Sequence, residues 1–137
     1  MQLRIVRWIF VVAGLYGTVL TISMLVHPPA MLGKAPWQQP EIYYGFATMG
    51  LAWQVVFFLI AGDPRRYRIM MFVSAIYDKL AFVAVLVVLL LKRRAGLYWV
   101  GPAVNEFVFA MAFLVSYFLT AEPRKPTDPV LPPMRGD

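Results

Sequence analysis

Two side chains that can carry opposite charges, Asp78 and Lys79, stand next to each other near the middle of an apolar run over residues 69–91. A helix of ~20 apolar residues is long enough to cross a bilayer. Each charged side chain at its centre costs roughly 2.5–3.5 kcal/mol, so the pair offsets most of the gain from the surrounding apolar residues. We therefore expect polar groups on neighbouring helices to pair with both charges.

Three further polar residues, Gln54, Asn105 and Glu106, lie inside other apolar runs. A rise of ~1.5 Å per residue places Gln54 near the depth of Asp78, and places Glu106 within reach of the Lys79 side chain. Because consecutive residues on a helix diverge by ~100°, Asp78 and Lys79 should need different partners. We expect Asp78 to meet Gln54, and Lys79 to meet Glu106 with Asn105 beside it.

These five residues, Asp78, Lys79, Glu106, Gln54 and Asn105, form a candidate ligand-binding or proton-responsive site, because ionisable groups inside a membrane are costly and usually functional. The same residues also have a purely structural interpretation, in which two acids and one base neutralise each other and hold helices together. The sequence leaves both interpretations open.

Composition places the chain in a membrane. Of the 137 residues, 61% are hydrophobic and 15% are charged, whereas soluble domains average about 45–50% and ~25%. The net charge is +6, but most basic residues flank apolar runs, which indicates contact with lipid head groups and not with nucleic acid. There is no cysteine and only one histidine, His27, so we expect no metal site and no other cofactor.

The apolar runs predict an all-α, four-helix transmembrane bundle in one domain over residues 1–121, with helices near residues 5–27, 41–61, 64–92 and 97–121. The turn Gly62-Asp63-Pro64 should join the second and third helices into an antiparallel hairpin, with Asp63 as N-cap and Pro64 in the first helical position. Gly96 is a plausible C-cap of the third helix. Pro102 leaves two starts open for the fourth helix, Leu97 or Gly101. Residues 122–137 are rich in proline and predict a disordered cytoplasmic tail.

The distribution of Lys and Arg predicts the orientation. If both termini are cytoplasmic, eight of these residues lie inside: Arg4, Arg7, Arg65, Arg66, Arg68, Arg124, Lys125 and Arg135. Four then lie outside: Lys34, Lys92, Arg93 and Arg94. Because cytoplasmic loops carry the excess of basic residues, we expect an N-in/C-in topology.

Several segments in the middle third resemble a block in small uncharacterised bacterial four-helix membrane proteins. They are Tyr43-Tyr44-Gly45-Phe46, Leu51-Ala52-Trp53-Gln54, Asp63-Pro64-Arg65-Arg66-Tyr67-Arg68 and Asp78-Lys79-Leu80. The layout of those proteins is broadly similar to that of DoxX-like proteins. The resemblance implies a multi-pass protein of the bacterial inner membrane, and it implies no activity.

Several classes of four-helix membrane protein do not fit. Disulfide-generating quinone enzymes need cysteines, di-haem cytochromes need several histidines, and small multidrug exporters typically carry an essential glutamate in the first helix. No arrangement typical of an intramembrane protease is present. Two functions stay open: binding or transport of a small lipophilic or weakly charged molecule, and a non-catalytic accessory or scaffold subunit that contacts a second copy or another membrane protein. Neither requires catalysis.

Overall fold

The computed structural model describes residues 2–27 and 40–121, and every regular element within these ranges is a helix. The elements are α1 (Gln2–Val26), α3 (Pro40–Gly62), α4 (Arg68–Val73), the π-helix η1 (Ser74–Leu80), α5 (Ala81–Leu91), the 3₁₀-helix η2 (Leu97–Trp99) and α6 (Val100–Leu119). Four stretches of this part are long and apolar enough to span a membrane: Gln2–Val26, Tyr43–Gly62, Arg68–Leu91 and Leu97–Leu119. The predicted all-α fold with four spanning helices is confirmed, as in a multi-pass membrane protein. The predicted tail over residues 122–137 lies outside the described residues.

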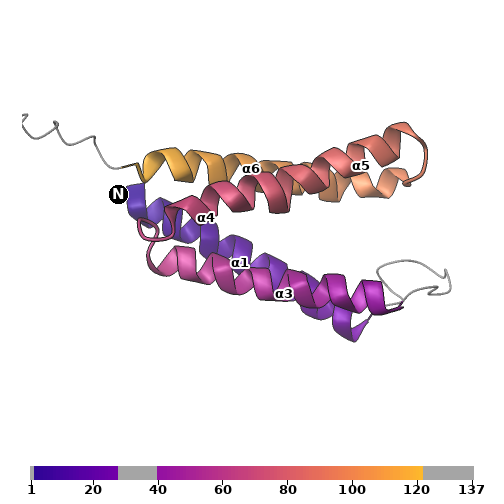
Figure 1. Ribbon diagram of the computed structural model, residues 1–137, viewed down its shortest axis with the longest axis horizontal. Coiled ribbons are helices and arrows are strands. Elements are labelled where there is room, and N and C mark those ends of the chain that lie inside the picture. Colours follow the sequence, from indigo (N-terminus) through magenta and orange to yellow (C-terminus); the bar gives the residue numbers. More distant parts are fainter. Residues whose placement is uncertain (1, 28–39, 122–137) are drawn as a thin grey trace, which may run out of the picture.

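The helices form two pairs that diverge from a common end (Figure 1). Helix α1 packs along α3, and α6 packs along the rod formed by α4, η1 and α5. The two pairs contact each other through α1 with α6 and through α3 with α4. The expected hairpin of the second and third helices is therefore packed along only part of its length, up to Phe57 on α3 and Lys79 on η1, because the main partner of α3 is α1.

An aromatic core joins the two pairs at their common end. The rings of Phe10 from α1, Phe57 from α3 and Phe113 from α6 are almost completely buried. Phe10 and Phe113 stack with centroids 4.4 Å apart, and Phe57 meets Phe113 edge-on at 5.1 Å. Such ring pairs add ~0.5–1.5 kcal/mol each to the effect of burial, so three spanning helices are fixed at one point.

Small residues allow the close approach of α1 and α3. A Cβ atom on Gly17 would overlap the side chain of Gln54, and one on Gly50 would lie 3.0 Å from the methyl group of Thr21. Small residues at helix contacts are typical of membrane proteins, where close backbone packing replaces hydrophobic association. This interface uses steric fit and carries no ion pair among the described residues.

The third spanning helix begins at Arg68, four residues after the predicted start at Pro64. The Asp63 carboxylate accepts a hydrogen bond from the Arg66 amide at 3.1 Å, so Asp63 caps this turn as expected. The backbone of Tyr67, with φ −98° and ψ 20°, then interrupts the helix. Arg68 donates from Nε to the Tyr117 carbonyl at 2.9 Å, which ties the turn to the end of α6.

The fourth spanning helix combines the two starts that the sequence left open. A 3₁₀ turn begins at Leu97, and the α-helix follows from Val100 with Pro102 in its first turn. Proline is tolerated there because the amide hydrogen that it lacks would have no partner inside the helix.

Helix α5 ends in a Schellman motif, in which Arg93 and not Gly96 takes the left-handed conformation. Arg93 has φ 54°. Its amide donates to Leu90 O at 3.0 Å, and the Arg94 amide donates to Leu89 O at 2.8 Å. These are the two hydrogen bonds of the motif, whose left-handed residue is usually glycine. The expected cap at Gly96 is therefore wrong by three residues.

We predict that Arg93→Gly stabilises the protein by ~1 kcal/mol, because an L-residue in the left-handed region costs ~1–2 kcal/mol and glycine has a larger unfolded-state entropy. Thermal unfolding in detergent measures the change. Arg94→Gly removes the same charge from a residue without a positive φ and should not stabilise. Equal stabilisation by both variants would contradict the assignment.

Candidate functional site

The charged residues of the third span lie in a π-helical segment. In η1 (Ser74–Leu80) the hydrogen bonds reach one residue further than in an α-helix, and the segment closes with the Ala81 amide on Ile76 O. Both Asp78 and Lys79 belong to it. π-helices are rare, and they occur frequently at functional sites. The segment contains no proline or glycine, so the sequence carried no signal for it.

Lys79 lies between two carboxylates. Its Nζ is 2.6 Å from Glu106 Oε2 on α6 and 3.1 Å from Asp78 Oδ2 on its own helix. The exposed fractions of the side chains are 12% for Lys79, 15% for Glu106 and 29% for Asp78. The structure therefore has the expected contact between Lys79 and Glu106.

The expectation that Asp78 and Lys79 cannot pair is wrong. It assumed the ~100° divergence of consecutive residues on an α-helix. A π-helix has more residues in each turn, so neighbouring side chains diverge less. The long, flexible lysine side chain then spans the remaining separation.

A third helix also contacts Lys79. Its Nζ lies 5.4 Å from the centroid of the Phe57 ring on α3, within the range of a cation–π interaction. Phe57 is also part of the aromatic core, so the charge is linked to the point where the helix pairs meet. Phe57 was not among the predicted site residues, because an apolar residue in an apolar helix gives no sign of its neighbour.

Gln54 lies elsewhere than predicted. Its Nε2 donates to Gly50 O at 2.8 Å, and its side chain lies against Gly17 in the α1–α3 interface. Among the described residues it makes no hydrogen bond with Asp78. The rise per residue predicts only the depth of Gln54 along the membrane normal. The direction in which its side chain points depends on the packing of α3 against α1.

Asn105 precedes Glu106 on α6, and its Nδ2 is buried without a hydrogen-bond partner among the described residues. Asp78 Oδ2 is also buried, and apart from its ion pair with Lys79 at 3.1 Å it has no hydrogen-bond partner among the described residues. Trp53 Nε1 and Gln54 Oε1 are likewise buried and unpaired within residues 2–27 and 40–121. Buried polar atoms normally have partners, so these groups retain unused capacity for hydrogen bonds.

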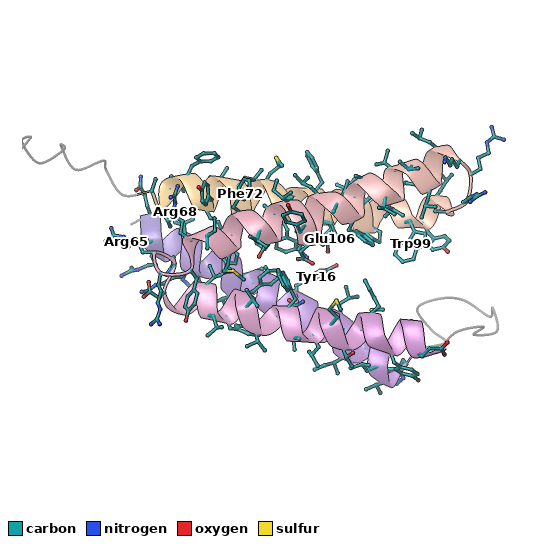
Figure 2. The ribbon with its side chains drawn as sticks, viewed as in Figure 1. Tyr16, Arg65, Arg68, Phe72, Trp99 and Glu106 are labelled. Carbon is teal, nitrogen blue, oxygen red and sulfur yellow. The ribbon has the colours of Figure 1, made fainter. Side chains whose placement is uncertain are left out.

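The charged cluster of Asp78, Lys79 and Glu106 lies on the inner side of its helix pair. Figure 2 shows Glu106 on the side that faces α1, where Tyr16 lies. The Tyr16 ring is 5.7 Å from that of Phe109, one turn after Glu106 on α6. Within the described ranges no three His, Cys, Asp or Glu side chains converge as a metal site.

No protein-family model, curated protein or solved structure matches this chain. The candidate function therefore depends on the geometry of the site.

We predict that Glu106→Gln destabilises the protein by up to ~3–5 kcal/mol, the cost of a fully uncompensated buried charge, because only Asp78 then pairs with the Lys79 ammonium. Adding Lys79→Met should restore much of this loss. Thermal or denaturant unfolding in detergent measures both changes, and Glu41→Gln at an exposed position serves as the control. A double variant no more stable than Glu106→Gln alone would show that the two side chains are not energetically coupled.

Proposed function

We propose that this protein binds or transports a small lipophilic or weakly charged molecule at the cluster of Asp78, Lys79 and Glu106, with Asn105 beside it. The observation that carries the proposal is the unused hydrogen-bonding capacity of Asp78 Oδ2 and Asn105 Nδ2 next to an ion-paired lysine inside a membrane span. Such groups can orient a ligand through a few polar contacts. Gln54 has no part in this site, since it packs against α1.

The surroundings of the cluster support a ligand with apolar parts. Phe57 contacts the ammonium of Lys79, and Tyr16 and Phe109 form a ring pair nearby on α1 and α6. The carboxylates and the ammonium sum to one negative charge when all are ionised, so the cluster favours a neutral or weakly positive partner over an anion. The π-helix supports a functional role, since such segments recur at binding sites.

A second function, that of a non-catalytic accessory or scaffold subunit, is favoured by one specific observation. Lys79 forms two ion pairs with other described residues of the chain, and the shorter one joins η1 to α6. A buried ion pair of this kind can specify helix packing without any ligand. In this alternative the cluster only fixes the bundle, and the exposed helix faces contact another membrane protein.

The proposed setting is the inner membrane of a bacterium, with a DoxX-like layout and both termini in the cytoplasm. The sequence segments of the middle third support the first part, and the excess of Lys and Arg at one end supports the orientation.

We expect a reporter that works only in the cytoplasm to be active when it is fused after Asp137. A reporter that works only in the periplasm should be active when it is inserted after Arg94. Activity of the periplasmic reporter after Asp137 would reverse the proposed orientation.

The function is tested by native mass spectrometry of protein purified from its host membrane. We expect wild type to retain a small molecule other than a phospholipid, and Asp78→Asn to lose it with a smaller fall in unfolding temperature than Glu106→Gln, because the shorter ion pair of Lys79 with Glu106 remains. Glu41→Gln should retain it. A wild-type spectrum with a protein partner and no small molecule would favour the accessory role.

A further inference from the structure

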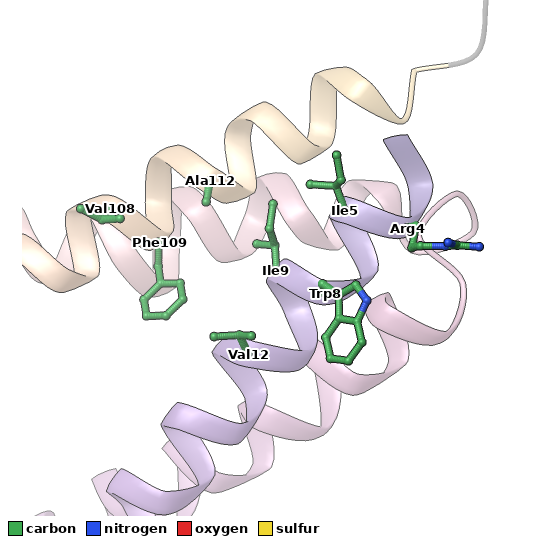
Figure 3. Close-up of a pocket in the computed structure, with 8 residues that line it drawn as sticks. All are labelled: Arg4, Ile5, Trp8, Ile9, Val12, Val108, Phe109 and Ala112. Atoms are coloured by element: carbon green, nitrogen blue, oxygen red, sulfur yellow. The ribbon is translucent and has the colours of Figure 1, made fainter. Parts of the chain in front are cut away.

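An open apolar groove of about 480 Å³ runs between α1 and α6. Ile5, Trp8 and Val12 line it from α1, and Val108 and Phe109 line it from α6 (Figure 3). On α1 the groove extends from Arg4 to Val12, or ~12 Å at 1.5 Å per residue. None of its lining residues belongs to the charged cluster, so it is a separate feature.

Charge is confined to one end of the groove. Arg4 lies at that end, and its guanidinium extends away from the apolar side chains (Figure 3). Arg4 is exposed and has no ion pair with any residue in the described ranges. Trp8 lies next to it and is 62% exposed, as is typical of an aromatic residue at the boundary between hydrocarbon and head groups.

The same end of the molecule carries further basic residues. Arg65 and Arg68 lie there in Figure 2, and with Arg66 they line a second hollow beside Tyr117 and Thr120. The nearby carboxylate of Asp63 is held by the Arg66 amide. An anionic group at the mouth of the groove therefore meets a positive potential, and an apolar chain attached to it meets an apolar wall.

We propose that the groove seats one acyl chain of an anionic phospholipid from the surrounding bilayer, with the lipid phosphate bound by Arg4. The arrangement suits both the head group and the acyl chain of such a lipid. A basic side chain at the membrane surface attracts anionic head groups, and the groove continues from there into the hydrocarbon layer. This lipid site is independent of the proposed ligand at Lys79, because the two sites share no residue.

The test is a titration of delipidated protein in detergent, read by native mass spectrometry. The probes are phosphatidylglycerol and phosphatidylcholine with identical acyl chains. Wild type should bind phosphatidylglycerol more tightly. Arg4→Gln should weaken that binding about fivefold, the ~1 kcal/mol expected for one basic side chain near the surface. The matched control is Arg7→Gln, an exposed arginine of the same helix that does not line the groove.

A second pair of variants tests the acyl chain. Val108→Trp fills the groove and should reduce binding of both lipids, whereas Val85→Trp, on α5 outside the groove, should not. The two valines are 59% and 60% exposed, so neither change disturbs the core. Equal binding of the two lipids by wild type, equal effects of Arg4→Gln and Arg7→Gln, or equal effects of the two tryptophans would each overturn the proposal.

Discussion

A lysine ammonium inside a membrane-spanning helix must be neutralised within the protein, and the way in which this happens to Lys79 determines much of the bundle. Its short contact with Glu106 fixes the register of η1 against α6. The second contact, with Asp78, depends on the π-helical geometry of the same segment. Phe57 adds α3 to the set of helices that surround the charge. One cation thus constrains three of the four spans.

The other helix pair is held by a different kind of interaction. Between α1 and α3 the backbones approach closely at Gly17 and Gly50, and the Gln54 side chain fills the space that a larger residue at position 17 would need. Ion pairs determine how the helices pack in one half of the molecule, and steric fit determines how they pack in the other. The stacked rings of Phe10 and Phe113 join the halves where they meet. The two pairs can diverge beyond this point because each is already stabilised along its own length.

Much of this arrangement follows from local properties of the sequence. Runs of apolar residues define the four spans, and depth along a helix brings Lys79 and Glu106 to within reach of each other. Three features depend on information that a single helix does not contain. The pairing of α3 with α1 turns Gln54 away from Asp78, the π-helix brings Asp78 back to Lys79, and the left-handed residue after α5 is Arg93 although Gly96 is close by. The direction in which Gln54 points depends on which neighbouring helix packs against α3. The π-helix and the left-handed conformation of Arg93 depend on backbone conformations that few residue types favour.

The divergence of the two helix pairs has a consequence for the membrane itself. At the end that carries the N-terminus and the last turn of α6, the spans lie close together, and at the end where α3 begins and α5 ends they lie apart (Figure 1). In a bilayer such a body has a smaller cross-section in one leaflet than in the other. It is a wedge, and lipids packed around a wedge are least strained where the bilayer curves to match its shape.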